Sequence, residues 1–503
     1  MTSALWLLSL AAVAVSSLRW LRVGQREHYL PGSVSEFAWR WWTLNLINTF
    51  LLALVILGLV VVFMDGEDLI VIGLGVAFIM VIAPRGLGVK GSTSPLIWTD
   101  RLRRVAIFTA ILWLAVAVSG AMWHSGVMLV ALVVLPILMD LALWVLAPVE
   151  RRLNGKWVNE AHAKLASIDP TVVAITGSYG KTTTKGLVAA LASPHLTVVA
   201  SPASFNNRMG LARAINEHLA LDTDVFIAEM GTYGPGEIRD LCSWIPPKIA
   251  VITAIGPVHL ERFGSLDVTV AAKAEIFEHA EVAVVNIDDE RLAALVPDLG
   301  QDSIITCSAE GADATVSLSP SESGFFVRLR GEVISEIGAV AMPSNLACAI
   351  GVAAALEVPL DRLSSIISET QAPAHRQDVF LGEGGFHIID DTYNSNPAGV
   401  RSALSALAGL GEGRRVVVTP GMVELGSAQF RENKEFGRMA AEVASDVLVV
   451  GHTNRKALLE GTKDGAASVI VMLSRPEAVA WVKANLGVGD AVLYENDLPD
   501  HYA

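Results

Sequence analysis

The sequence predicts an α/β protein in three parts: an N-terminal helical transmembrane domain, a P-loop doubly wound parallel-sheet domain, and a smaller Rossmann-like α/β domain at the C-terminus. Three observations support this division. Of the 503 residues, 52% are hydrophobic and only 17% are charged, which is unusual for a wholly soluble chain. Ten of the twelve tryptophans lie at or before Trp157. From residue 171 onward, short β-branched segments alternate with helical ones, as in a parallel sheet. We expect domains at residues 1–150, 165–372 and 373–503.

The charge distribution separates the first part from the rest. Residues 1–156 carry 12 basic and 8 acidic residues, a net charge of +4, whereas the remainder carries 25 basic and 43 acidic residues, a net charge of −18. An acidic chain lacks the basic surface that displaces counterions from nucleic acid, so we expect no nucleic-acid partner. Cys242, Cys307 and Cys348 are too few and too widely spaced for a disulfide framework, which excludes a disulfide-stapled secreted protein.

Apolar runs predict the membrane domain. The third run is shorter than the roughly 20 residues that cross a bilayer. The first run has no basic segment before it, so we interpret it as a retained span and not a cleaved signal. About five spans are expected, at residues 2–18, 43–64, 69–83, 105–123 and 127–147.

The loops between these runs predict the orientation. Residues 18–43, 84–104 and 147–156 carry all the connecting Lys and Arg, whereas residues 65–68 and 124–126 carry none. Because cytoplasmic loops collect Lys and Arg, we expect a multi-pass protein of the cell inner (cytoplasmic) membrane with its N-terminus outside and everything after residue 150 in the cytoplasm.

Asp140 lies inside the fifth run. Carboxylates within a membrane are costly and often functional, but such a residue can also simply hydrogen-bond a neighbouring helix. Both readings stay open on the sequence alone.

A glycine-rich loop follows the first predicted strand and opens a helix at residues 177–185. Gly177 and Gly180 let backbone amides face a polyphosphate at the positive end of that helix. Lys181 would reach the β- and γ-phosphate oxygens, and the Thr182 hydroxyl would bind magnesium. The spacing Gly-x-x-Gly-Lys-Thr is two residues shorter than the common Walker loop. We expect phosphate binding by Gly177, Ser178, Gly180, Lys181, Thr182 and Thr183.

Further strands are predicted on both sides of residue 373, and parallel strands place a ligand at their carboxyl ends. Residues 303–341 predict a hairpin excursion, and residues 343–358 a helix of small residues. The other predicted strands are 197–201, 224–230, 249–255 and 282–287 in the central domain, and 386–390, 415–419, 446–450, 468–473 and 491–494 in the last domain.

Five stretches, in order, resemble the Mur ligases, the cytoplasmic amide ligases that build the peptidoglycan stem peptide. The resemblance covers about residues 165–503, and its last stretch is most similar to the branch that adds D-alanyl-D-alanine to a UDP-linked muramoyl tripeptide. The stretches are the phosphate loop, Ser-Phe-Asn-Asn at 204–207 with Gly210, Ala-Glu-Met-Gly at 228–231 with 236–238, residues 257–277, and Asp-Asp-Thr-Tyr-Asn-Ser-Asn-Pro at 390–397.

The resemblance implies an ATP-dependent ligase that makes an amide through an acyl phosphate, with Mg²⁺, in two ions, as cofactor. Glu229, at the end of a buried strand, is a hard oxygen ligand suited to magnesium; a helix cap or a surface charge is the alternative. The resemblance implies that His259 binds the second ion and that Lys273 carries a carbamate; a packed histidine and a salt-bridged lysine are the alternatives. The implied catalytic residues are Lys181, His259, Lys273 and Arg376.

The resemblance also implies nucleotide and substrate contacts. Asn286 would read adenine, Arg376 would reach ATP phosphates, and Asp390 would bind ribose, with Tyr393 and Asn394 facing the cleft. The alternatives are turn chemistry for the asparagines and an interdomain salt bridge for the arginine. The implied substrate residues are Ser204, Asn206, Asn207 and Asn396.

Three departures from the family concern the substrate half. Membrane spans stand where the UDP-sugar-binding domain is usual, and residues 419–426 and 494–499 differ from the usual Gly-Asp-Met-x-Glu-Leu-Gly and Lys-Gly-Ser-Arg. A short linker, about residues 150–169, would tether the site near the membrane and favour a lipid-linked or membrane-delivered acceptor. The alternative is a plain anchor, with a soluble UDP-linked peptide as the small-molecule substrate. Envelope-synthesis proteins are possible partners. Two alternatives remain: a poly-γ-glutamate or other envelope-polymer ligase, and an inactive membrane scaffold.

Overall fold

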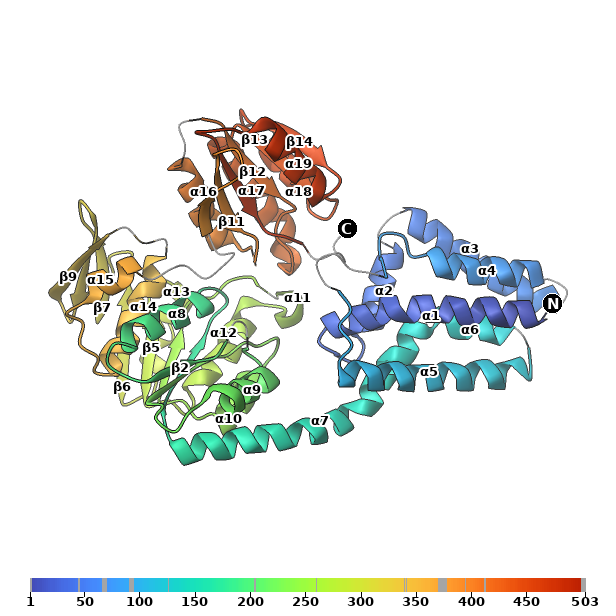
Figure 1. The fold of residues 1–503 in the computed structure, drawn as a ribbon, viewed down its shortest axis with the longest axis horizontal. Helices are drawn as coiled ribbons and strands as arrows, with labels where there is room; N and C mark the ends of the chain where they lie inside the picture. The colour runs from blue at the N-terminus through green and yellow to red at the C-terminus, as the bar shows by residue number, and fades with distance from the viewer. Residues whose placement is uncertain are drawn as a thin grey trace. The chain divides into compact units, whose positions relative to one another are not determined.

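The structure is a computed structural model, and it divides the chain into two compact units that are described separately: residues up to Asn154, and Gly155–Asp497. Four predicted site residues, Ser204, His259, Arg376 and Asn394, lie outside the described residues. The described residues are 2–43, 46–65, 70–89, 95–124, 126–202, 205–258, 260–338, 340, 342–369, 378–393, 395–410 and 413–498 (Figure 1).

The first unit is helical. Among the described residues, three helices (in α1, α3 and α5) are long and apolar enough to cross a membrane, and a fourth span results if α6 and α7, bent by 64°, count as one. The third predicted run forms α4, whose 13 residues fall short of a span, and α2 was not predicted. The helices are α1 (Thr2–Arg26), α2 (Ser33–Thr43), α3 (Leu46–Asp65), α4 (Ile70–Ile82), α5 (Asp100–Ala121), α6 (Gly126–Val133) and α7 (Leu135–Ile168).

Asp140 binds the start of α2. Its two carboxylate oxygens accept hydrogen bonds from the backbone N–H groups of Val34 (3.2 Å) and Ser35 (2.8 Å). The first amides of a helix lack partners within the helix and lie at its positive end, so a buried carboxylate stabilises them. Of the two readings of Asp140, the structure favours the bond to a neighbouring helix.

A nine-stranded sheet forms the centre of the second unit. Its strand order is β2-β3-β1-β4-β5-β6-β7-β8-β9, parallel through β7 and antiparallel from β7 to β9. The predicted hairpin excursion is therefore a continuation of the sheet. The strands are β1 (Thr171–Thr176), β2 (Val198–Ala200), β3 (Val225–Glu229), β4 (Ile249–Ile252), β5 (Val282–Asn286), β6 (Ser303–Ser308), β7 (Val316–Pro320), β8 (Gly324–Leu329) and β9 (Glu332–Gly338).

Helices cover both faces of this sheet because alternate strand residues point to opposite sides. One core packs α8 (Lys181–Ala192), α14 (Pro343–Ala355) and α15 (Leu363–Glu369), of which α8 and α14 lie side by side in Figure 1. The other core packs α9 (Arg208–His218) and α10 (Glu237–Trp244) on the opposite face.

The C-terminal half of α7 also belongs to this second core. Val158, Ala161 and Leu165 are buried there, and the helix continues to Ile168. Residues 150–168, most of the predicted linker, are thus helical. The second unit starts at Gly155, ten residues before the predicted boundary at 165.

A six-stranded sheet follows, in the order β10-β11-β15-β12-β13-β14, with only β10 antiparallel. All five predicted strands of the last domain are present, and β10 was not predicted. Helices α16 (Pro397–Ala408), α17 (Gln429–Val443) and α18 (Arg455–Thr462) pack on one face and α19 (Arg475–Asn485) on the other. The strands are β10 (Asp378–Leu381), β11 (His387–Asp391), β12 (Arg415–Thr419), β13 (Asp446–Val450), β14 (Ser468–Met472) and β15 (Ala491–Glu495).

Candidate functional site

The loop between β1 and α8 has the backbone shape that the sequence predicts. Gly177 and Gly180 have φ angles of +153° and +78°, values that residues with a Cβ rarely adopt. A Cβ on Gly180 would also lie 2.3 Å from Oδ1 of Asn345 in α14. Gly180 caps α8, whose free N-terminal amides can bind an anion.

Two lysines meet at this loop. The Nζ atoms of Lys181 and Lys273 donate hydrogen bonds to the Gly177 carbonyl oxygen, at 2.7 Å and 3.2 Å. Lys273 is only 4% exposed, and burial together with the charge of Lys181 lowers its pKa well below the ordinary lysine value. The structure therefore brings together two predicted catalytic residues that are 92 positions apart in the sequence.

Glu229, at the end of β3, is the acidic centre of the site. It accepts hydrogen bonds from Lys185 Nζ (2.9 Å), Thr182 Oγ1 (3.0 Å) and Asn206 Nδ2 (3.3 Å). Burial alone would raise its pKa, but Lys185, Lys181 and Thr182 together hold that pKa below the ordinary glutamate value. Glu229 is therefore a buried carboxylate that stays ionised.

Lys185 is a site residue that sequence reasoning missed. It is buried on α8 and forms an ion pair with Glu229. Its position four residues after Lys181 places both on one face of the helix, and this spacing is the signal that could have identified it.

The Thr182 hydroxyl and the Glu229 carboxylate are hard oxygen donors in contact, which fits a magnesium site. Among the residues that the structure describes, no three or more His, Cys, Asp or Glu side chains gather as a metal-binding group. His259 lies outside those residues. The metal roles of Thr182, Glu229, His259 and Lys273 therefore stay predictions.

Asn286 lies at the end of β5, the strand that pairs with β4. Its Nδ2 donates to the Thr253 carbonyl (2.8 Å), and its Oδ1 accepts from the Asp288 backbone N–H (3.2 Å). These bonds join two strand ends and match the turn alternative. Adenine recognition by Asn286 remains a prediction.

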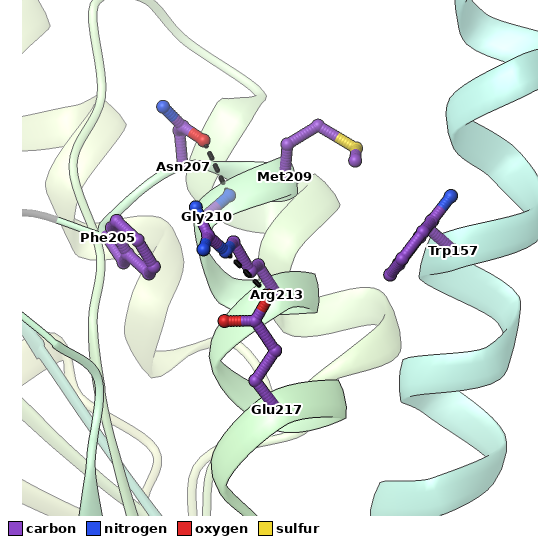
Figure 2. A pocket seen from close by; sticks show the side chains of 7 residues that line it. All are labelled: Trp157, Phe205, Asn207, Met209, Gly210, Arg213 and Glu217. Carbon is purple, nitrogen blue, oxygen red and sulfur yellow. Dashed lines mark hydrogen bonds and ion pairs between the residues drawn. The ribbon is translucent and has the colours of Figure 1, made fainter.

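A cavity of about 440 Å³ lies between α7 and α9, next to the predicted substrate loop (Figure 2). Asn207 lines it and caps α9, because its Oδ1 accepts from the Gly210 N–H at 2.9 Å. Trp157, which lies in the predicted linker, forms the α7 wall. The lining residues are Trp157, Phe205, Asn207, Met209, Gly210, Arg213 and Glu217.

The predicted residues of the last domain have local partners. Asp390 Oδ1 accepts from the N–H and the Oγ1 of Thr392, at 3.2 Å and 2.5 Å. Asn396 Oδ1 accepts from the Gly399 N–H (2.9 Å) and caps α16, and Tyr393 is 51% exposed. These bonds match the turn alternative, and the ribose and substrate contacts stay predictions.

Glu495 is a second buried carboxyl group that the sequence did not identify. It lies at the end of β15, Ser395 Oγ donates to it at 2.6 Å, and burial and Asp391 raise its pKa well above the ordinary value. Nearby, Asn496 Nδ2 donates to the Gly421 carbonyl at 2.6 Å. The two segments that depart from the family pattern therefore contact each other.

Comparison with protein families matches residues 175–353 to the Mur ligase middle domain and residues 375–494 to the Mur ligase, glutamate ligase domain. The UDP-N-acetylmuramoyl-tripeptide--D-alanyl-D-alanine ligase of Mycobacterium tuberculosis is 32% identical over 378 residues, 67% of this chain and 72% of the relative. The corresponding ligase of Bacillus subtilis is 27% identical, over 61% of this chain and 73% of the relative.

Solved structures agree with these matches. MurF from Thermotoga maritima in complex with ADP has a TM-score of 0.60 at 25% identity, covering 68% of this chain and 80% of that chain. MurF from Acinetobacter baumannii has a TM-score of 0.60 at 24% identity, covering 69% and 77%. The matched domains coincide with the nine-stranded and six-stranded sheets.

Proposed function

This chain belongs to the Mur ligase family, and we propose that it is an ATP-dependent amide ligase of peptidoglycan precursor synthesis that joins D-alanyl-D-alanine to a UDP-linked muramoyl tripeptide. The observation that carries the proposal is the 32% identity to a ligase named for that reaction, over 72% of its length. The retention of Lys181, Thr182, Glu229 and Lys273 around the phosphate loop argues against an inactive scaffold.

In this reaction the acceptor carboxylate attacks the γ-phosphate of ATP, and an amine then displaces phosphate from the acyl phosphate. The loop amides and Lys181 bind and neutralise the phosphates, which lowers the barrier mainly by positioning and charge. Asn206 would hold the acceptor beside Glu229, since its amide already lies 3.3 Å from that carboxylate. Asn286, Asp390, Tyr393, Asn394 and Arg376 are the proposed contacts to the rest of the nucleotide.

Thr182 and Glu229 would hold a magnesium ion, with His259 and a carbamylated Lys273 for a second. Bound magnesium supplies positive charge that stabilises the transferring phosphoryl group. Ionisation of Glu229 suits it as a ligand. The lowered pKa of Lys273 increases the share of neutral amine, the form that reacts with carbon dioxide.

A second candidate function is ligation of another envelope polymer, such as poly-γ-glutamate. It is favoured by the contact between the two departing segments, where Asn496 bonds Gly421, because both lie in the substrate half of the site. The same reaction chemistry would then act on a different carboxylate and amine.

We further propose that the first unit anchors the protein in the cell inner membrane as a multi-pass domain, with both ligase domains in the cytoplasm. The three candidate spans and the distribution of Lys and Arg support this. A reporter fused after residue 156 should be cytoplasmic, and one at residues 65–68 should be outside. Membrane attachment would favour a lipid-linked acceptor.

Purified intact protein in detergent, with ATP, Mg²⁺, the UDP-linked tripeptide and D-alanyl-D-alanine, should form the pentapeptide and release phosphate, as read by mass spectrometry. A panel with lipid-linked tripeptide and with glutamate polymers runs in parallel. Product from the polymer alone would replace the first candidate by the second. Phosphate release with no product from any acceptor would contradict both.

A further inference from the structure

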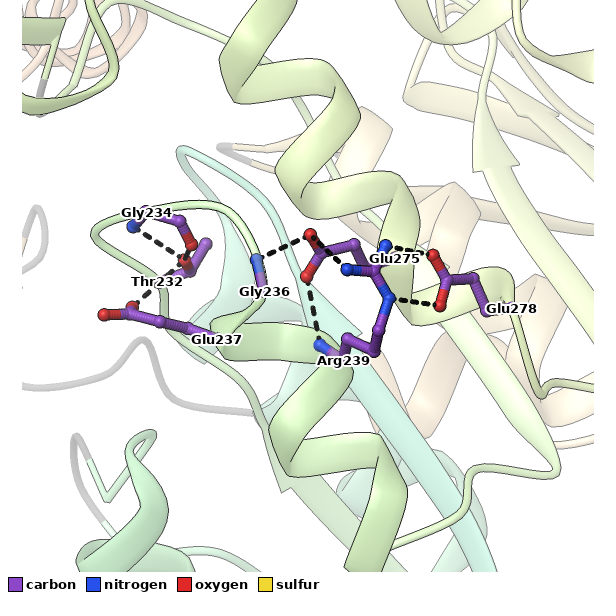
Figure 3. Close-up of polar contacts among 7 residues, drawn as sticks. All are labelled: Thr232, Gly234, Gly236, Glu237, Arg239, Glu275 and Glu278. Carbon is purple, nitrogen blue, oxygen red and sulfur yellow. Dashed lines mark hydrogen bonds and ion pairs between the residues drawn. The ribbon is translucent and has the colours of Figure 1, made fainter.

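Glu275 joins two segments that carry site residues. It lies in the short 3-10 helix η2 (Glu275–Phe277), two residues after Lys273, which is in α12 (Leu266–Ala274), and is 5% exposed. Its oxygens accept hydrogen bonds from the backbone N–H groups of Gly236 (2.7 Å) and Arg239 (3.0 Å) at the start of α10 (Figure 3). We propose that Glu275 is a positioning residue, which holds Lys273 in register with the strand end that carries Glu229; this rests on the proposed ligase function.

The start of α10 needs a partner from elsewhere in the chain. Its N-cap residue is Gly236, with φ of +86°, which has no side chain to accept from the first amides. A carboxylate at this position satisfies two amides and interacts favourably with the positive end of the helix. Glu275 therefore caps α10 from a distant part of the sequence, in place of a side chain at the N-cap position.

Both segments continue directly into the site. On one side, β3 ends at Glu229, and the following Gly231 N–H donates to the Asn206 carbonyl at 2.7 Å. On the other side, Lys273 donates to the Gly177 carbonyl of the phosphate loop. A displacement of α12 relative to α10 would move the Lys273 amine away from the loop, and positioning errors of about 1 Å can cost about 100-fold in rate.

The loop between β3 and α10 also has internal hydrogen bonds that do not involve Glu275. The Glu237 carboxylate accepts from the Tyr233 N–H (2.7 Å) and the Thr232 hydroxyl (3.2 Å), and that hydroxyl donates to the Gly234 carbonyl (Figure 3). Loss of Glu275 should therefore let α12 shift relative to α10 without unfolding the loop.

Glu278 provides a matched control. It binds the exposed Arg239 guanidinium through both oxygens, Nε to Oε2 at 2.7 Å and Nη2 to Oε1 at 2.5 Å, one helical turn beyond Glu275. Arg239 also lies 3.6 Å from Glu275. Exposed ion pairs contribute little, so Glu278→Gln should remove charge from the same cluster with little effect.

The test compares Glu275→Ala, Glu275→Gln and Glu278→Gln in the intact protein. We expect Glu275→Ala to lower kcat about 10- to 100-fold, with ADP affinity within about threefold of wild type. Glu275→Gln keeps one acceptor oxygen, so its kcat should fall less than that of Glu275→Ala. The kcat of Glu278→Gln should stay within about twofold of wild type. In a Lys273→Ala background, Glu275→Ala should lower kcat by less than about a further threefold, because both substitutions act through the Lys273 amine. Full additivity, or unchanged kcat in Glu275→Ala, would overturn the proposal.

A second measurement does not need turnover. The rate of modification of Lys273 by an amine-reactive reagent, followed by peptide mass spectrometry, should rise at least about tenfold in Glu275→Ala and not in Glu278→Gln. Lys185, also buried, is the internal reference. An equal rise at Lys185 would indicate general loosening and refute positioning. If wild type shows no ligation, the proposed function fails, and this labelling still decides whether Glu275 places Lys273.

Discussion

Two carboxyl groups at strand ends, Glu229 of β3 and Glu495 of β15, are equally buried and yet differ in charge. They are 2% and 0% exposed. Burial raises the pKa of Glu229, but Lys185 and Thr182 outweigh it and lower that pKa, whereas burial and the nearby Asp391 raise the pKa of Glu495 despite the hydrogen bond from Ser395. Burial alone favours the neutral acid, and only an adjacent cation keeps such a group ionised. The difference indicates an ionised carboxylate in one sheet and a neutral hydrogen-bonding acid in the other.

The cations around Glu229 give the largest expected effect. Lys181→Ala should reduce ATP-dependent ligation about 1000-fold, because the phosphates lose their charge partner while the loop amides remain. Circular dichroism and membrane insertion should be unchanged. Lys434→Ala, which removes an exposed ion pair on α17, is the control and should keep its activity. Normal turnover in Lys181→Ala would show that the loop between β1 and α8 is not the nucleotide site.

Substitution of Lys273 tests whether a carbamate on this residue adds a second negative group near Glu229. Lys273→Ala and Lys273→Arg should both lose about 100-fold or more in kcat, because arginine keeps positive charge and cannot carry a carbamate. Steady-state assays with and without added bicarbonate measure this. Wild-type activity in Lys273→Arg would leave Lys273 only a structural role, as a donor to the Gly177 carbonyl.

Lys185→Met should leave Glu229 buried without its closest cation, as Glu495 is in wild type. Breaking a buried pair on one side costs about 3–5 kcal/mol of unfolding free energy. Thermal denaturation measures the loss, and Lys185→Met combined with Glu229→Leu should recover most of it. A single variant as stable as wild type would contradict the pairing.

Glu495→Gln should have the smallest effect, below about 1 kcal/mol at pH 5, because glutamine replaces an acid that is already neutral. The folded-state pKa of Glu495 is raised, so its contribution to stability is present below the ordinary glutamate pKa and is lost as pH rises through the folded-state pKa. The variant should therefore gain stability relative to wild type between pH 5 and pH 8. A stability difference that stays constant with pH would show that Glu495 is ionised.

The sequence predicted the phosphate loop and the parallel strands because both depend on local pattern. Gly177 and Gly180 are needed for backbone shape, and the β-branched runs alternate with helices. The pairing of Lys185 with Glu229 and the contact of Glu275 with α10 were not predicted, since they join segments about 40 residues apart, and the second uses backbone amides that carry no side-chain signal. Helix α7 was predicted as a span plus a linker, although Val158, Ala161 and Leu165 follow helical spacing.

The central claim, that ATP activates the acceptor carboxylate, is tested most directly with ¹⁸O. In the intact protein, a tripeptide whose reacting carboxylate carries ¹⁸O should transfer one labelled oxygen to inorganic phosphate for each amide formed, because the oxygen that attacks the γ-phosphate leaves with it. Mass spectrometry of the released phosphate measures this. Amide formation with unlabelled phosphate, or with the label in AMP, would contradict the account.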